Sequence, residues 1–291
     1  MERRTLILAL VVVSLVSVAR GASAQLLAAK DGPIVYGHHH VSTVNIEAQK
    51  KFLVDALGGT AIKIGTNNTE IVKFPNVLIF FRNQAPTGGT KGTTANHIGF
   101  SVPKLRAAVD RIKANGYKMI TTTEAPAGRE VKDDIAAPAQ PGGASIAFAM
   151  GPDETKVELV EAPKQTAPIQ LNHIHFFGQR NAEMQAWYVK TFGAKPRTPA
   201  PGAIFLSADL PGVALNFTPS PEPVVGTQGR AVDHIGFEVK NLEAFTKKLE
   251  ADGIKLDRPY TKVAALDIAI AFITDPWGTY IELTEGLDRV R

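Results

Sequence analysis

The feature that most constrains this chain is an internal repeat. Residues 97–118 and 234–255, which lie 137 positions apart, are identical at ten of 22 aligned positions, far above chance. Both stretches begin with His-Ile-Gly-Phe-x-Val, a run that alternates as a β-strand does. Both continue into an amphipathic helix that ends at Asn115-Gly116 or Asp252-Gly253, a common helix C-terminal signal. The chain is therefore built from copies of one small unit.

Two weaker copies complete the pattern. His39–Val44 leads into a predicted helix over 47–57, and His173–Phe177 leads into a predicted helix over 182–192. Three strand-like runs follow each helix. The unit is therefore βαβββ, and four such units predict an α+β fold.

A Pro-rich stretch divides the four units into two pairs. Residues 163–170 follow the second unit and read as a domain linker. We therefore expect a first domain over 25–162 and a second over 171–291, each with two consecutive units. A second Pro, Ala and Gly-rich stretch, 121–143, has two readings: a simple surface loop, or a flap over the first cleft.

Strand alternation in the last unit places an imidazole and a carboxylate on one face. Ile235 and Phe237 point to one side of their strand and His234 to the other, and Glu282 opposes Ile281 in the same way. With the apolar sides against a helix, His234 and Glu282 project from the open face of one sheet. This pair suits a divalent metal.

The four units resemble the vicinal oxygen chelate superfamily, which includes glyoxalase I, extradiol ring-cleaving dioxygenases, fosfomycin-resistance proteins and bleomycin-binding proteins. The marks of the resemblance are His-Ile-Gly-Phe-x-Val at His97 and His234, and Asp275-Pro276-x-Gly278-x-x-x-Glu282-Leu283 near the end. The resemblance implies that each pair of units forms a cup-shaped sheet around one metal ion. Ligands then come from the first and last strand of each unit.

Carried over by position, the resemblance implies a ligand set for each domain. Strand alternation selects His39, rather than His38 or His40, for the first unit. The fourth family position falls on Phe80 and Asn216, neither a strong ligand. Two imidazoles and one carboxylate favour Fe²⁺ or Mn²⁺, with Zn²⁺ and Ni²⁺ as the other candidates. The implied sets are His39, His97 and Glu158 in the first domain, and His173, His234 and Glu282 in the second.

Three further residues are candidates for catalysis. His175 shares a strand face with His173 and could shuttle protons, or simply be a partly buried histidine. Glu238 shares its face with His234 and could be a base, a second carboxylate ligand or a rim ion-pair acid. Tyr260 could stand at the mouth of the cleft or pack on the sheet.

The N-terminus and the composition indicate where in the cell the protein is expected. Residues 1–24 have a basic start, an apolar run and a small-residue end at Ala22-Ser23-Ala24, the pattern of a cleavable signal peptide. We therefore expect a periplasmic or secreted protein with no membrane attachment after cleavage. The chain has no cysteine, which excludes thiolate ligands and cysteine nucleophiles. No Lys/Arg run suggests a nucleic-acid partner. A small-molecule substrate is expected, and a homodimer is compatible with the sequence.

Three functions compete. A ring-cleaving dioxygenase agrees with the chain length and the ligand set, although Phe272 stands where that group has Tyr and residues 263–271 hold no His. A glyoxalase-type lyase or isomerase would need a base at the positions that Phe80 and Asn216 occupy in this chain, and neither residue can serve as one. A non-catalytic, resistance-type binding protein requires only the cup. The preferred interpretation is an exported metal-dependent enzyme that acts on a small vicinally oxygenated compound.

Overall fold

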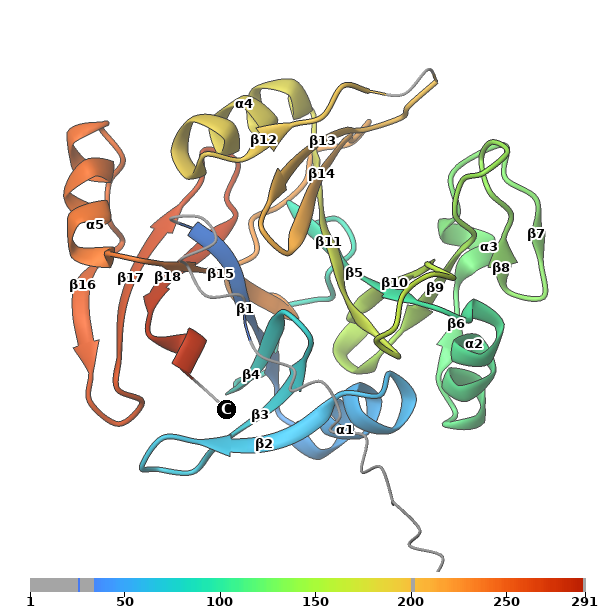
Figure 1. Ribbon diagram of the computed structural model, residues 1–291, viewed down its shortest axis with the longest axis horizontal. Helices are drawn as coiled ribbons and strands as arrows, with labels where there is room; N and C mark the ends of the chain where they lie inside the picture. The colour runs from blue at the N-terminus through green and yellow to red at the C-terminus, as the bar shows by residue number, and fades with distance from the viewer. Residues whose placement is uncertain (1–25, 27–33, 200–201, 290–291) are drawn as a thin grey trace, which may run out of the picture.

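The computed structural model describes residue 26, residues 34–199 and residues 202–289. The predicted signal peptide, residues 1–24, lies outside these residues. The described part contains the four predicted βαβββ units, arranged in two sheets (Figure 1). None of its helices is long and apolar enough to span a membrane.

Units one and four form one sheet. Unit one comprises β1 (Ile34–Thr43), α1 (Ile46–Lys51) with a π-helical turn η1 (Phe52–Ala56), β2 (Thr60–Ile64), β3 (Thr69–Phe74) and β4 (Val77–Asn83). Unit four comprises β15 (Val232–Val239), α5 (Leu242–Ala251), β16 (Arg258–Val263), β17 (Ile268–Thr274), β18 (Tyr280–Glu285) and a 3₁₀ turn η3 (Leu287–Arg289). The strand order is β16-β17-β18-β15-β1-β4-β3-β2, with β1 antiparallel to β15 at the centre. We call this the first sheet.

Units two and three form the second sheet. Unit two comprises β5 (Ala95–Val102), α2 (Leu105–Ala114), β6 (Lys118–Met119), α3 (Thr121–Glu124), β7 (Val131–Lys132), β8 (Ile135–Ala136), β9 (Ile146–Met150), a 3₁₀ turn η2 (Pro152–Glu154) and β10 (Lys156–Glu161). Unit three comprises β11 (Gln170–Gly178), α4 (Asn181–Phe192), β12 (Lys195–Pro196), β13 (Leu206–Leu210) and β14 (Val213–Pro219). The order is β12-β13-β14-β11-β5-β10-β9-β8-β7, with β6 on β9 and β5 antiparallel to β11.

The pairing of the units differs from the prediction. The predicted domains, 25–162 and 171–291, each contain two consecutive units, whereas the strands join unit one to four and two to three. The predicted linker does not separate the two units beside it. Gln165 accepts a hydrogen bond from the Ser101 hydroxyl at 2.6 Å and donates one to the Ser101 carbonyl at 3.0 Å. These contacts hold the connection between β10 and β11 against β5.

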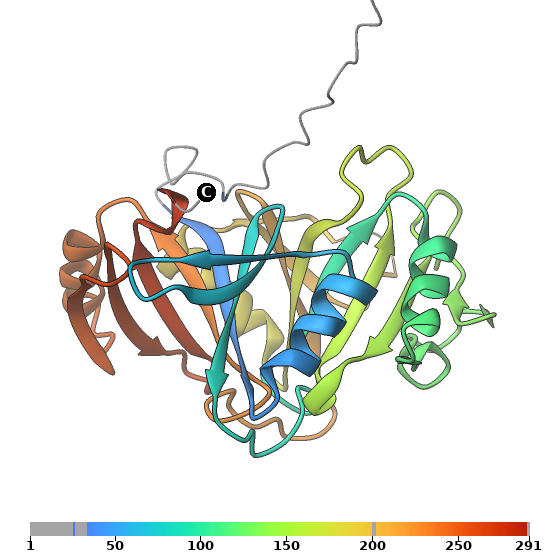
Figure 2. The same ribbon diagram turned by 90° about the horizontal axis from the view of Figure 1, so that it is seen from below.

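One large core joins the two sheets. Phe192 of α4, in unit three, stacks on Phe237 of β15, in unit four, with ring centroids 4.6 Å apart. Phe52 of η1, in unit one, meets Tyr117 of unit two at 4.8 Å. Units one and two, and units three and four, therefore pack against each other although their strands belong to different sheets. Figures 1 and 2 show α5 and α2 at opposite ends of the molecule. The face of each sheet that points away from this core can carry a functional site.

Candidate metal centre

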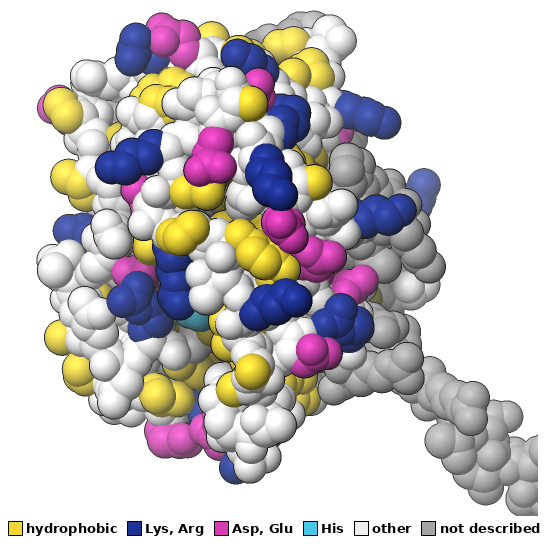
Figure 3. All heavy atoms as spheres, turned by 90° about the vertical axis from the view of Figure 1, so that its left-hand side faces the viewer, with side chains coloured by type: hydrophobic (Ala, Val, Ile, Leu, Met, Phe, Trp, Pro, Cys, Tyr) yellow, Lys and Arg dark blue, Asp and Glu magenta, His cyan; other side chains and the backbone are white. Residues whose placement is uncertain are grey.

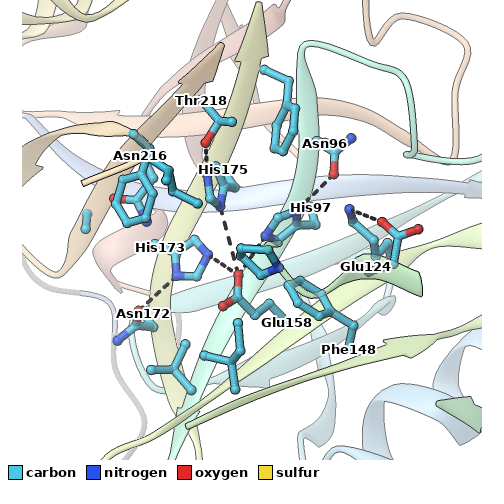
Figure 4. A pocket seen from close by; sticks show the side chains of 18 of the residues that line it. Asn96, His97, Glu124, Phe148, Glu158, Asn172, His173, His175, Asn216 and Thr218 are labelled. Carbon is cyan, nitrogen blue, oxygen red and sulfur yellow. Dashed lines mark hydrogen bonds and ion pairs between the residues drawn. The ribbon is translucent and has the colours of Figure 1, made fainter. Parts of the chain in front are cut away.

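Each sheet gathers three histidines and one glutamate on the face away from the shared core. In each set, ligand atoms from all four residues lie within 4.8 Å of one another. The β1–β15 cluster, on the first sheet, consists of His38, His40, His234 and Glu282. The β5–β11 cluster, on the second sheet, consists of His97, His173, His175 and Glu158 (Figure 4).

The two clusters correct the predicted ligand sets. His97 and Glu158 share a cluster with His173, not with His39, and His234 and Glu282 are in the other sheet from His173. The cause is the pairing of the units, because each metal cup needs the first strands of the two units that actually pair.

His39 points to the other face. Its Nδ1 lies 3.4 Å from the Tyr36 hydroxyl, and Tyr36 belongs to the core. The strand register skips Gly37, since Tyr36 pairs with Phe237 and His38 with Gly236. A bulge of one residue reverses the alternation of every side chain after it. His38 and His40 therefore face the cup, and the simple alternation used for the prediction fails.

Bulges recur beside the histidines and orient them. Asn172 and Asn96 are skipped in the β5–β11 register. Their side-chain oxygens accept hydrogen bonds from the Nδ1 of His173 at 2.9 Å and of His97 at 3.0 Å. Each bond fixes the proton on Nδ1 and leaves Nε2 with its lone pair toward the cluster.

Glycines in the two strong repeats make room for the rings. A Cβ on Gly99 would lie 2.1 Å from Cε1 of His173, and one on Gly236 would lie 2.0 Å from Cε1 of His38. The Gly of His-Ile-Gly-Phe is therefore required by an imidazole on the neighbouring strand.

Lone pairs converge on one carboxylate oxygen in the β5–β11 cluster. Oε2 of Glu158 lies 2.8 Å from Nε2 of His97 and 3.1 Å from Nε2 of His173. Burial lowers the pKa of His97 well below its ordinary value, against the pull of the nearby Glu158 carboxylate, so that ring is neutral. Burial alone would raise the pKa of Glu158, but His173 and the other imidazoles hold it well below its usual range. Imidazole nitrogens around an ionised carboxylate form a donor set that suits a divalent cation.

His175 stands slightly apart from the other three. Its Nδ1 lies 3.9 Å from Glu158 Oε2, and its Nε2 is 2.7 Å from the Thr218 hydroxyl. Burial lowers the pKa of His175 to about 4, so the ring is neutral at neutral pH. It can serve as a fourth nitrogen ligand or as a proton acceptor beside the ion.

The β1–β15 cluster is already balanced by its own charges. Nε2 of His38 and of His234 each lie 3.0 Å from Glu282 Oε2. Nδ1 of His234 meets Asp233, where the second sheet has Asn96, at 2.6 Å. Burial alone would lower the pKa of His234, but its hydrogen bonds to Asp233 and Glu282 raise it. These two hydrogen bonds favour the protonated form of His234, which opposes the binding of a cation beside it.

Apolar side chains also fill the first cup. His40 stacks on Phe80 at 4.7 Å and on His234 at 4.1 Å. A separate hydrophobic cluster covers this face of the sheet; its buried members are Leu26, Ile64, Ile71, Leu78, Phe80, Ile268, Ile270, Phe272 and Leu287. Figure 3 shows the side of the molecule that lies at the left of Figure 1, where a small area of histidine surface is visible among hydrophobic and charged side chains.

The β5–β11 cluster, in contrast, lies in a cleft of about 1420 Å³. One wall comes from β12–β14, and another from the 121–143 segment, including Glu124 and Arg129. Of the two readings of that segment, the structure favours the flap. Two hydrogen bonds of 2.6 Å, from Arg129 to the carbonyls of Ala137 and Ala144, hold it in shape.

The chain was compared with known proteins. The model of the Glyoxalase/Bleomycin resistance protein/Dioxygenase superfamily matches residues 170–283. This segment belongs to that superfamily. The match spans units three and four, whose strands lie in different sheets. No curated protein matched.

Several solved structures share the fold of nearly the whole chain. Glyoxalase I from Zea mays has a TM-score of 0.64 at 16% identity, over 88% of this chain and 94% of its own. A variant of the maize enzyme scores 0.65 at 18% identity, over the same shares. A putative dioxygenase from Bacillus subtilis subsp. subtilis str. 168 scores 0.60 at 12% identity, over 86% of this chain and 84% of its own. At these identities the likeness concerns the fold.

The other two predicted catalytic residues lie away from both clusters. Glu238 is buried, and its carboxylate accepts hydrogen bonds from the Thr284 hydroxyl at 2.7 Å and from the Gly286 amide at 2.5 Å. Tyr260 packs against the shared core. Each therefore matches a structural role: an internally bonded acid and an aromatic packed on the sheet.

Sequence reasoning missed His38, His40 and the residues that orient the rings. The run His38-His39-His40 was itself the signal, because one bulge decides which two of its members face the cup. A second signal was the polar residue before each motif histidine, Asn96 and Asp233, which the register shows to be bulged.

Proposed function

We propose that this protein is a metal-dependent enzyme of the vicinal oxygen chelate type, acting on a small vicinally oxygenated substrate in the cleft of the β5–β11 cluster. The observation that carries the proposal is the convergence of His97, His173 and Glu158 on one point inside an open cleft. The β1–β15 cluster is excluded from substrate binding because apolar side chains fill its cup.

His97, His173 and Glu158 would hold the ion, with His175 beside them. A divalent ion there would bind two adjacent substrate oxygens and stabilise negative charge on them as a Lewis acid. Fe²⁺ or Mn²⁺ is preferred on the two-histidine, one-carboxylate set, and the third imidazole also suits Zn²⁺ or Ni²⁺.

The protein's own groups supply the remaining chemistry. Asn96 and Asn172 hold the ring nitrogens in the correct tautomer. His175 is neutral, and its Nδ1 faces the cluster while its Nε2 bonds Thr218, so it is placed to accept a substrate proton. The flap and the apolar rings of Phe148 and Phe177 restrict water at the reacting centre.

A dioxygenase-like reaction is preferred over the two alternatives. Asn216, at the position where a glyoxalase-type lyase carries a carboxylate base, donates no such group to the cleft, and His175 would have to replace it. A non-catalytic binding protein would use the same cleft without proton transfer. We also propose export to the periplasm or beyond, supported by the signal-like residues 1–24.

The first test is the metal content of the purified protein. About one Fe or Mn per chain supports the dioxygenase, Zn or Ni supports the lyase, and no metal supports the binder. Oxygen uptake with a panel of catechols then tests the reaction itself.

Two matched variants assign the site. Glu158→Gln should abolish metal binding and activity, whereas Glu282→Gln, at the equivalent position of the first sheet, should retain both. Loss of metal and activity in Glu282→Gln with retention in Glu158→Gln would overturn the proposal.

A further inference from the structure

A buried lysine lies beside the β5–β11 cluster and takes no part in holding an ion. Lys156 stands two residues before Glu158 on β10, and only 4% of its side chain is exposed. Its Nζ donates to Glu124 Oε2 at 3.0 Å, and it lies 5.5 and 5.8 Å from the ring centroids of Phe148 and Phe177. An ammonium has three N–H donors. Among the described residues, one carboxylate oxygen accepts from it.

This wall of the cleft has more positive than negative charge. Glu124 serves two ammonium groups, because Lys91 Nζ donates to its Oε1 at 2.6 Å. Arg129, half-buried, directs two of its donors to backbone carbonyls rather than to an acid. One carboxylate thus faces three cations on this wall, and the charge of Glu158 would be taken by the ion.

The opposite wall does not cancel this surplus. Arg197 and Asp209 pair with each other there through two hydrogen bonds of 2.7 and 2.6 Å. Glu222, which also lines the cleft, is exposed to solvent. The inner cleft therefore keeps a net positive charge, concentrated beside the cluster.

The first sheet has no equivalent of this lysine. Tyr280 stands two residues before Glu282, where the second sheet has Lys156, and it stacks on Phe272 at 5.1 Å. At this position of the repeat, two residues before the cluster glutamate, the described residues place a buried ammonium in the cup that is open to a ligand and a tyrosine in the closed cup. If it served only the common fold, the closed cup would be expected to carry a cation at this position as well.

We propose that Lys156 recognises an anionic group of the substrate, a carboxylate carried on the same small molecule as the two vicinal oxygens, with Arg129 adding to the positive field. This inference rests on the proposed function. An ammonium with free donors, desolvated against two aromatic rings, binds an anion more strongly than a surface lysine does. The predicted substrate class is thus a vicinal diol, catechol or hydroxyketone that bears a carboxylate.

The experiment compares two probes that differ in one charge. Protocatechuate, a catechol with a ring carboxylate, and its uncharged methyl ester are titrated calorimetrically into the full chain loaded with Mn²⁺. The wild type should bind protocatechuate about 10-fold tighter, as one hydrogen bond to a charged group allows. Lys156→Met should abolish this preference and keep the affinity for the ester, which also reports an intact fold.

Two further variants sharpen the result. Lys91→Met removes the exposed partner of the same Glu124 and should leave most of the preference. Glu124→Gln frees Lys156 without removing it and should increase the preference for protocatechuate.

The outcomes separate this inference from the proposed function. Equal affinity of the wild type for both probes overturns the role of Lys156 and leaves the metal site standing. An equal loss in Lys156→Met and Lys91→Met also overturns it, because the effect would then belong to the general charge of the cleft. Binding of neither probe to the Mn²⁺-loaded protein refutes the proposed function, and this inference with it.

Discussion

The sharpest test of the site is the substitution Gly99→Ala on β5. The new Cβ would lie 2.1 Å from Cε1 and 2.4 Å from Nδ1 of His173. Carbon atoms pack at about 3.5–4.0 Å, so the imidazole must move by roughly 1.5 Å or the two strands must separate. Either response removes His173 Nε2 from the point on which Glu158 and His97 converge.

The magnitude follows from this overlap. Overpacking a well-packed site costs about 1–3 kcal/mol, and each kcal/mol lowers the unfolding temperature of chains of about this size by about 2–4 °C. Metal affinity should fall further. Because loss of an outer-shell partner alone costs about 10–100-fold, displacement of a ligand should cost about 100-fold or more.

Gly236→Ala is the matched control, since its Cβ would lie 2.0 Å from Cε1 of His38 in the first sheet. Both variants are assayed by thermal unfolding and by metal content after dialysis. Both should lose similar stability, but only Gly99→Ala should lose the ion. Equal metal content in Gly99→Ala and the wild type, or equal loss in the two variants, would refute the reasoning.

Three further predictions follow from the same contacts. Asn96→Ala removes the acceptor of His97 Nδ1 and should weaken metal binding by about 10–100-fold in a chelator competition; unchanged affinity would mean that Asn96 does not set the tautomer. His175→Asn should lower kcat while the metal content is kept, whereas loss of the ion would make His175 a ligand instead of a proton acceptor. Burial raises the pKa of Glu238, so its contribution to stability is full below its unfolded pKa and is lost as the pH rises through the folded value. Glu238→Gln should accordingly gain unfolding temperature relative to the wild type at about pH 8 compared with about pH 5, and the opposite trend would contradict this assignment.

The local sequence pattern predicted much of the fold. The repeat predicted four βαβββ units, and the three strands predicted after the helix of unit one are present as β2, β3 and β4. The prediction worked because side-chain alternation and helix-ending glycines depend on neighbouring residues. The family resemblance placed His97 and Glu158 in one ligand set and His173 in another, and the structure brings these three together.

Two features could not be predicted from the local sequence pattern. The bulge at Gly37 turned His39 away from the cup and His38 and His40 into it, and a bulge is visible only against the partner strand. The contrast between the cups also depends on tertiary contacts, because Leu26 and Leu287 cover the first cup from distant parts of the chain.

The amino-acid sequence by itself determined the units and their number, since these follow from short-range periodicity and repetition. Only the tertiary structure decided which units share a sheet. All four first strands offer similar apolar faces and hydrogen-bonding edges, so the choice of β15 for β1 and of β11 for β5 rests on how the whole chain packs around its common core. That choice brings His97, His173 and Glu158 to one point and leaves their cleft open.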